Sequence, residues 1–375
     1  MIIESDAALV PVVARLRADG LAVLDTEFVW TRTYFPRLGI VQLAAADGTA
    51  WVADAAAAGP ALAGLLADPD TLKILHDARQ DLTLLAAVTG AAPRRVFDTR
   101  LAAGFAGLGT TLSLKQLLHD LLDVDLPKTE TRTDWCRRPL TAAQLDYALD
   151  DVRHLGRLRQ TLLARVAERG ATGWLEEELR LYDDSRLYAP TDPDTAWQRV
   201  KGGSRLAARD QPLLRALAAL RERRAMAWDL PRNWVVDDES LIEIAARRPA
   251  SPEAVRPRHR LHRERIETLC QEICEAVRTS ARHPSPGADG PSGRRPDGGL
   301  KTRVDAALSF LRQRGAELRI DPALLGSRAE VAALVAQGAG PAHPLGRGWR
   351  FEVAGRDLTA RLDAEPPDLF QTAGA

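Results

Sequence analysis

The sequence predicts an α/β domain, a mixed sheet with flanking helices, followed by two small all-α modules. In the first half of the chain, short runs rich in β-branched residues alternate with helical stretches, a pattern typical of a layered α/β fold. From residue 205 onward the helical pattern dominates. One helical pattern also recurs within that second half, which indicates a duplicated module.

The predicted strands and helices of the first domain follow from these runs. We expect strands at Leu21–Thr26, Gly39–Leu43 and Leu72–Leu75, and helices over Leu82–Val88 and Ser113–Leu122. Strands that alternate with helices in this way favour a sheet covered by helices.

One helix start is marked especially clearly. Thr141 and Gln144 form a Thr-x-x-Gln capping box, in which each side chain satisfies a free backbone N–H group. An apolar stripe at helical spacing then runs from Leu145 to Leu163. We therefore expect a single long helix to begin at this box.

The predicted domain boundaries come from two Pro-rich stretches and one repeat. The stretch "YAPTDPDTAW" and the stretch "RHPSPGADGPSGRRPDGG" are expected to be linkers. The segment "LRERRAMAWDLPRNWVV" from Leu220 aligns at a constant offset with "LRQRGAELRIDPALLGS" from Leu311. The expected organisation is an α/β domain at 1–172, a linker at 173–204, a helical domain at 205–281, a flexible linker at 282–299, a second helical domain at 300–366 and a tail at 367–375.

Composition narrows the class of protein. The 375 residues are 45% hydrophobic and 27% charged, with a formal net charge of zero, so any attraction to nucleic acid has to be local. Three cysteines argue against a disulfide framework and for a reducing compartment. No stretch approaches 18 uncharged apolar residues, and no basic region precedes the first apolar residues. A cytoplasmic location, away from membranes, is therefore expected.

Four acidic residues and one tyrosine are the candidate catalytic set. Asp25 and Glu27 end a predicted strand and point to one side of it, while Tyr147 and Asp151 lie four apart on one helix face. Asp81 stands in the segment "HDARQDL". A cluster of carboxylates without His or Cys suits Mg²⁺, and two cations can bracket a phosphate during in-line hydrolysis. The pattern predicts metal-assisted cleavage of a phosphodiester.

Each part of this set is a weak signal by itself: a solvated surface pair is the better explanation of Asp-x-Glu alone, and Tyr-x-x-x-Asp alone is equally weak. In this order, however, the five residues resemble the DEDDy branch of the DnaQ-like 3′-5′ exonucleases, whose domain is ribonuclease H-like. Three longer blocks are similar to the ribonuclease D family: "LDTEFVWTRTYFPRLGIVQLA", "HDARQDLTLL" and "SLKQLLHDLLDVDLPKTETRTDWCRRPLTAAQLDYALDDVRHL". The duplicated module resembles the HRDC domain, clearly in the first copy and weakly in the second.

The resemblance implies a role for each of the five residues. Asp25, Glu27, Asp81 and Asp151 would be ligands of two divalent cations, Mg²⁺ or Mn²⁺, and Tyr147 would orient the attacking water. Asp81 would act partly through water.

The implied reaction is hydrolysis of RNA from its 3′ end to 5′-nucleoside monophosphates, with precursor tRNA or another structured RNA as substrate. No obligate protein partner is evident. Two alternatives stay open: a DNA 3′-5′ exonuclease with the same five residues, and a non-catalytic RNA-binding scaffold.

Five further residues are candidates for contacts with nucleic acid, and each has a structural alternative. Phe28 is a candidate stacking wedge or a core residue. His76 is a candidate phosphate contact or a local hydrogen-bond partner. Lys128, Arg132 and Arg138 are candidate backbone-phosphate contacts or members of an exposed basic loop. We also expect Asp77 to cap the helix after its strand and Asp150 to be solvated.

Overall fold

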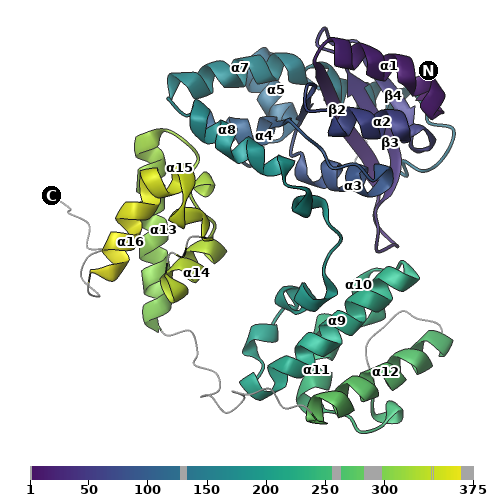
Figure 1. Ribbon diagram of the computed structural model, residues 1–375, viewed down its shortest axis with the longest axis vertical. Coiled ribbons are helices and arrows are strands. Elements are labelled where there is room, and N and C mark those ends of the chain that lie inside the picture. The colour runs from purple at the N-terminus through teal and green to yellow at the C-terminus, as the bar shows by residue number, and fades with distance from the viewer. Residues whose placement is uncertain are drawn as a thin grey trace. The chain divides into compact units, whose positions relative to one another are not determined.

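The computed structural model describes residues 2–126, 133–255, 263–282, 298–338, 340 and 342–364. The chain divides into two compact units (Figure 1). Unit 1 comprises Met1–Phe28, Leu38–Ala189 and Pro296–Ala375, and unit 2 comprises Val29–Arg37 and Pro190–Arg295. The last helices of the chain therefore belong with its first domain.

Unit 1 is built on a six-stranded mixed sheet, as predicted. The strand order is β1-β4-β3-β2-β5-β6. β2 pairs in parallel with β5, and β5 with β6, whereas β3 pairs antiparallel with β4. The strands are β1 (Ile2–Ile3), β2 (Leu21–Val29), β3 (Arg37–Ala44), β4 (Ala50–Asp54), β5 (Leu72–Leu75) and β6 (Val96–Asp98).

Helices cover both faces of this sheet. The first face packs on α1 (Asp6–Ala18), α2 (Pro60–Ala67) and α3 (Arg79–Thr89). The second face packs on α4 (Thr99–Phe105), α5 (Leu114–Leu122), α6 (Ala142–Arg153), α7 (Leu155–Glu168) and α8 (Thr172–Arg180). Because side chains alternate along a strand, Ala22 and Leu24 of β2 enter the first core and Val23 enters the second. Asp25 and Glu27 share the parity of Val23, so β2 presents both to the face that carries α6.

The predicted strands and helix starts agree closely with the observed ones, with one correction. Ser113 caps α5. Both hydrogen bonds of the capping box at the start of α6 are present: the Thr141 hydroxyl accepts from the Gln144 N–H, and the Gln144 side chain accepts from the Thr141 N–H. The single long helix expected after that box is wrong, because the chain breaks at His154 into α6 and α7. Gly156, a poor helix former, follows the break directly. Val152, Leu155 and Leu158 nevertheless remain in one core.

The segment 173–204, expected to be a linker, is structured in its described part. Its beginning lies in α8, where Leu175 is buried in the core of unit 1. Its later part contains the 3₁₀ turn η4 (Pro193–Arg199), where Ala196 is buried in the core of unit 2. The other short turns are η1 (Ala55–Ala57), η2 (Leu181–Asp183), η3 (Ser185–Tyr188), η5 (Gly203–Arg205), η6 (Ala208–Asp210), η7 (Pro252–Ala254), η8 (Pro322–Leu324), η9 (Pro344–Gly346) and the π-helical η10 (Phe351–Gly355).

The first helical module forms unit 2 around its own core. It consists of α9 (Gln211–Trp228), α10 (Arg232–Val235), α11 (Asp238–Arg247) and α12 (Arg263–Arg282). Leu217, Val235, Leu241 and Ile273 are among the residues buried in that core.

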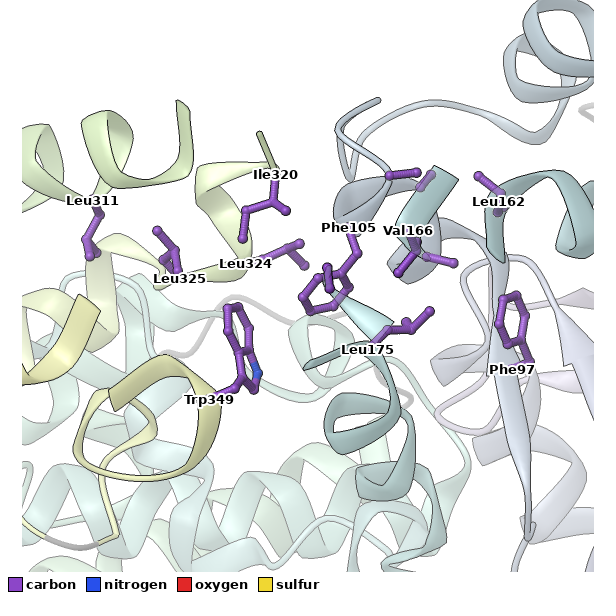
Figure 2. Close-up of a cluster of buried hydrophobic side chains, with 14 of the residues drawn as sticks. Phe97, Phe105, Leu162, Val166, Leu175, Leu311, Ile320, Leu324, Leu325 and Trp349 are labelled. Carbon is purple, nitrogen blue, oxygen red and sulfur yellow. The ribbon is translucent and has the colours of Figure 1, made fainter. Parts of the chain in front are cut away.

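The second helical module shares its core with the α/β domain. It comprises α13 (Gly298–Leu318), α14 (Arg328–Gln337), α15 (Gly348–Arg350) and α16 (Arg356–Asp363). Figure 2 shows Trp349 beside Phe105 of α4 and near Leu175 of α8, and the Phe105 and Trp349 rings meet edge to face at 5.2 Å. The two modules also share a local motif: α9 and α13 both end at a left-handed residue, Asp229 and Arg319.

Candidate active site

Asp25 and Glu27 lie on β2, next to the strand β5 that leads towards Asp81. Both side chains are partly buried and partly open to solvent. The apolar residues before them, Val23 and Leu24, are fully buried. The strand is therefore anchored in the core on both faces. Because side chains alternate along a strand, Asp25 and Glu27 point to the same side of it.

Asp81 reaches the site from the first turn of α3 and is 8% exposed. Its carboxylate accepts a hydrogen bond from the hydroxyl of Thr26, the residue between Asp25 and Glu27. Since Thr26 points to the opposite face of β2 from its neighbours, this bond ties α3 to the strand that carries the other two acids.

The loop before α3 is held by Asp98, at the end of β6. The Asp98 carboxylate accepts hydrogen bonds from the backbone N–H groups of Asp77 and Ala78, both at 3.0 Å, and from the Tyr182 hydroxyl at 2.6 Å. The expectation that Asp77 caps α3 is wrong. Asp77 has a left-handed backbone, the N-cap is Ala78, and the Asp77 carboxylate instead pairs with Arg100.

Tyr147 and Asp151 come from one face of α6. The Tyr147 hydroxyl and the Asp151 carboxylate lie close enough to influence each other's pKa. The indole ring of Trp135 stacks on the Tyr147 ring at 6.0 Å and is itself 3% exposed. Asp150, expected to be solvated, pairs with Arg153 at 2.8 Å on the helix surface.

The four carboxylates repel one another. Burial, followed by the charges of Asp81, Asp151 and Glu27, raises the pKa of Asp25 well above its ordinary value. Burial and neighbouring carboxylates raise the pKa of Glu27 to about 8. Burial is also the main cause that raises the pKa values of Asp81 and Asp151 to about 6 each. The pKa of Tyr147 is raised beyond its usual range by burial and by Asp151.

This arrangement fits divalent cations. Among the described residues, no Lys or Arg side chain is an influence on the pKa of Asp25 or Glu27. A cluster of carboxylates that repel one another is costly without a ligand. The donor set is entirely oxygen, as Mg²⁺ and Mn²⁺ prefer. Within the described part of the chain, no group of three or more His, Cys, Asp or Glu side chains is arranged so that it could hold a metal ion by itself. An ion here would therefore take one or two carboxylates and complete its shell from other oxygens.

The candidate residues for contacts with nucleic acid differ in their surroundings within the described part of the structure. Phe28 is half-buried beside the acidic pair, and the His76 ring nitrogen Nδ1 lies 3.0 Å from the Thr99 hydroxyl. Burial lowers the pKa of His76, so this ring is neutral at pH 7. Lys128 and Arg132 lie outside the described residues.

Arg138 has internal partners on all three guanidinium nitrogens. Nε donates to Asp54 at 2.6 Å, Nη1 to the carbonyl of Trp135 at 2.8 Å and Nη2 to the carbonyl of Gly39 at 2.8 Å. A Cβ at Gly39 would lie 2.6 Å from the Trp135 carbonyl, so the glycine permits this close approach. Arg138 thus fastens Trp135 to the sheet, and a contact with phosphate remains only a prediction for it.

Sequence reasoning did not single out Thr26, Asp98 or Trp135. Asp98 carried a signal, because an Asp between a strand and a helix is a favoured N-cap, and it does cap α4. Thr26 contacts Asp81, and Trp135 contacts Tyr147, and in each pair the partners are far enough apart in sequence that no local pattern predicts the contact.

The described helices include none that is both long enough and apolar enough to cross a membrane. None of the three cysteines, all within the described residues, forms a disulfide, and Cys270 and Cys274 are buried in the core of unit 2.

A mixed sheet that gathers four carboxylates and a tyrosine defines a nuclease-like domain, and comparison with known families agrees. Residues 1–167 match the family model described as 3′-5′ exonuclease, and residues 210–277 match that of the HRDC domain. The class is therefore a 3′-5′ exonuclease with an attached HRDC domain.

Individual relatives define the family more closely. Ribonuclease D of Desulfotalea psychrophila is 38% identical over 326 residues, covering 85% of this chain and 86% of the relative. Ribonuclease D of Granulibacter bethesdensis is 36% identical over 365 residues, covering 93% and 89%. The chain belongs to the ribonuclease D family of 3′-5′ exoribonucleases, and an exonuclease domain of this type uses divalent metal.

Solved structures agree with this assignment. The crystal structure of Escherichia coli RNase D, described as an exoribonuclease involved in structured RNA processing, matches with a TM-score of 0.82 at 27% identity, covering 98% of this chain and 99% of that one. The catalytic core of RRP6 from Trypanosoma brucei shares the fold, with a TM-score of 0.58 at 21% identity over 74% of this chain and 80% of that one.

Proposed function

We propose that this chain shortens structured RNA, such as precursor tRNA, from the 3′ end and releases 5′-nucleoside monophosphates. The observation that carries this is the cluster of four carboxylates in the exonuclease domain, whose charges raise one another's pKa values and for which the described residues supply no Lys or Arg partner at Asp25 or Glu27. Water attacks the last phosphodiester, and the 3′ oxygen of the preceding nucleotide leaves. The three cysteines, none of which forms a disulfide, support the cytoplasm as the site of action.

Asp25, Glu27, Asp81 and Asp151 are the proposed ligands of two divalent cations, Mg²⁺ or Mn²⁺. When bound, such ions neutralise the carboxylates and stabilise the charge that develops on the phosphate. Mg²⁺ is usually held through one or two carboxylates together with substrate phosphate, so the site would be completed by the RNA end itself. Thr26 holds the Asp81 carboxylate in place for this purpose.

Tyr147 is the proposed orienting group for the water. Its raised pKa keeps the phenol protonated, so it donates a hydrogen bond and does not act as a base. The stacked Trp135 ring restricts the orientation of the phenol. Tyr147 thus fixes where the water stands relative to Asp151.

The decisive experiment compares matched RNA and DNA strands with extended 3′ ends, each with and without Mg²⁺ or Mn²⁺. We expect stepwise, metal-dependent shortening from the 3′ end, faster on RNA, with release of 5′-nucleotides. Equal or faster shortening of DNA would favour the DNA exonuclease. Binding of RNA with no shortening under any metal condition would favour the scaffold.

A further inference from the structure

The hairpin between β2 and β3 carries two exposed aromatic rings. Trp30 is 54% exposed and Phe35 is 48% exposed. Among the described residues, these are the only aromatic side chains in the set of exposed large hydrophobic residues, which otherwise consists of Val10, Val88 and Leu181. Exposing two aromatic rings within six residues has a cost in water, and such a pair marks a surface that binds a ligand.

Hydrogen bonds within the hairpin hold the two rings in place. The indole N–H of Trp30 donates to the carbonyl of Tyr34 at 2.9 Å, and the Thr33 hydroxyl donates to the carbonyl of Phe35 at 2.6 Å. The Phe35 ring meets the Tyr34 ring edge to face at 4.8 Å. The rings are therefore presented on a defined backbone.

The HRDC domain contacts this hairpin through hydrogen bonds within unit 2. The Tyr34 hydroxyl donates to the Glu222 carboxylate at 2.5 Å. The Asp229 carboxylate accepts from the backbone N–H groups of Tyr34 and Phe35 at 3.0 and 3.1 Å. Glu222 is 1% exposed, so the hairpin is docked on the buried side of α9 and the C-terminal cap of that helix.

The same surface has an excess of positive charge. Arg37 pairs with Asp229 at 3.5 Å, and both Arg199 and Arg232 approach the single carboxylate of Glu222, at 3.5 and 3.9 Å. Arg32 is exposed on the hairpin itself. Four guanidinium groups thus accompany two carboxylates around a pair of exposed rings. Aromatic rings interleaved with arginine are the features that bind single-stranded nucleic acid without regard to sequence.

We propose that hairpin 29–37, docked on the HRDC domain, is a stacking platform for unpaired bases of the RNA strand. The platform rests on the proposed exoribonuclease function. Trp30 follows Glu27 by three residues, about 10 Å along an extended strand, so the chain itself links the platform to the catalytic acids. The bases that stack there lie upstream of the 3′ terminal nucleotide. The HRDC domain contributes by fixing the platform, besides any direct contact with RNA.

The first test compares side chains at residue 30 by measuring the Kd for a single-stranded RNA of about 12 nucleotides. We expect Trp30→Leu to bind about tenfold more weakly, because it keeps an apolar side chain but loses the stacking face, and Trp30→Phe to stay close to wild type. Val10→Ala, at a site that is 51% exposed on α1, is the matched control and should bind like wild type. Equal binding by Trp30→Leu and wild type would overturn the platform.

A second test identifies the stacked base. A single abasic position moved along the oligonucleotide should weaken binding by wild type at one or two upstream positions. At those positions Trp30→Leu should lose nothing further, because both changes remove the same contact. Additive losses at every position would show that Trp30 does not stack on a base.

Docking on the HRDC domain is tested at Asp229, whose backbone is left-handed with φ of 48°. Asparagine and glycine both tolerate this conformation, so neither substitution introduces strain. Asp229→Asn keeps the acceptor for the Tyr34 and Phe35 N–H groups and should bind RNA like wild type, whereas Asp229→Gly should resemble Trp30→Leu. Equal affinity for both variants would overturn the docking role.

Wild-type hydrolysis separates the two proposals. If wild type shortens RNA while Trp30→Leu binds and shortens it equally well, the platform is wrong and the exoribonuclease stands. If wild type shortens no RNA under any metal condition, the proposed function itself fails.

Discussion

Unit 1 contains two kinds of buried carboxylate, and their surroundings differ in one respect. At the junction of α8 with α15, Glu178 is 7% exposed and accepts hydrogen bonds from the Trp349 indole N–H at 2.7 Å and from Arg350 Nη2 at 3.0 Å. In the middle of β2, Asp25 has Asp81, Asp151 and Glu27 as charged neighbours among the described residues. One carboxylate is surrounded by donors and a cation, and the other by further carboxylates.

The difference separates a structural acid from a functional one. A buried charge with an opposite partner and donors can contribute to a unique fold, and removing its partner is strongly destabilising. A buried cluster of like charges destabilises the empty protein and becomes favourable only when a cation is added. Replacing an acid should therefore have opposite consequences in the two regions.

The largest effect is expected at the sheet end. Asp25→Asn keeps the shape of the side chain but removes a charge that we propose binds the cations. We expect this change to lower kcat by about a thousandfold, or about 4 kcal/mol. The metal-free variant should be at least as stable as wild type, because one repelling charge is gone. Exonuclease assays, thermal unfolding and RNA binding check these outcomes. Near-normal turnover, or loss of RNA binding with turnover of bound RNA retained, would contradict the assigned role.

The second effect is on stability and lies at the α8–α15 junction. Glu178→Gln leaves the Arg350 guanidinium without its counter-charge, so we expect the free energy of unfolding to fall by about 3 kcal/mol. Activity per folded molecule should not change. Denaturant titration and active-site normalised rates measure the two quantities.

The control for that experiment lies two residues earlier in the same helix. Glu176 pairs with Arg180 at 3.7 Å on the surface, and exposed pairs contribute under about 1 kcal/mol. Glu176→Gln should therefore hardly affect unfolding. Similar losses from both substitutions would show that the contrast between paired and exposed acids does not hold here.

A third, smaller effect is the pH dependence of the metal-free protein. The folded-state pKa values of Glu27 (about 8) and of Asp81 and Asp151 (about 6) lie above those of free side chains. The folded protein therefore retains protons that the unfolded chain has lost, and stability falls as pH rises from about 5 to 8. We expect the Tm in a chelating buffer to drop by about 3 °C or more across this range relative to Asp25→Asn. Saturating Mg²⁺ should abolish the difference, and a Tm that rises with pH in wild type alone would refute the electrostatic argument.

Local sequence signals predicted the parts of this fold that depend on local contacts. The strand Leu72–Leu75 and the Thr141–Gln144 capping box appear as predicted, because strand propensity and helix capping depend on neighbouring residues. The candidate catalytic residues were proposed from motif order, and the structure brings the charges of the four carboxylates together, while the role of each residue stays a prediction.

Contacts distant in sequence were not predictable in this way. The sequence made Arg138 a candidate for a phosphate contact or a member of an exposed basic loop, and the structure shows it held by Asp54 and Gly39, residues 84 and 99 positions away. The second helical module repeats the local pattern of the first, but Trp349 and Glu178 attach it to the exonuclease domain across 171 positions. A periodic apolar stripe indicates that a helix face is buried and does not specify against which partner.

The smallest expected effect concerns Trp135, whose ring stacks on Tyr147 and which we expect to act through it. Aromatic stacking contributes about 0.5–1.5 kcal/mol beyond burial, so Trp135→Leu should lower kcat about fivefold with KM nearly unchanged, while Trp135→Phe retains most of the rate. In a Tyr147→Phe background, which lacks the orienting hydroxyl, Trp135→Leu should cause little further loss, since both changes then affect the same contact. A fivefold loss in both backgrounds would mean that Trp135 supports the fold in general. If the loss of rate from Trp135→Leu occurs only when the Tyr147 hydroxyl is present, the Trp135 ring, which Arg138 holds in place, sets the position of the phenol beside Asp151.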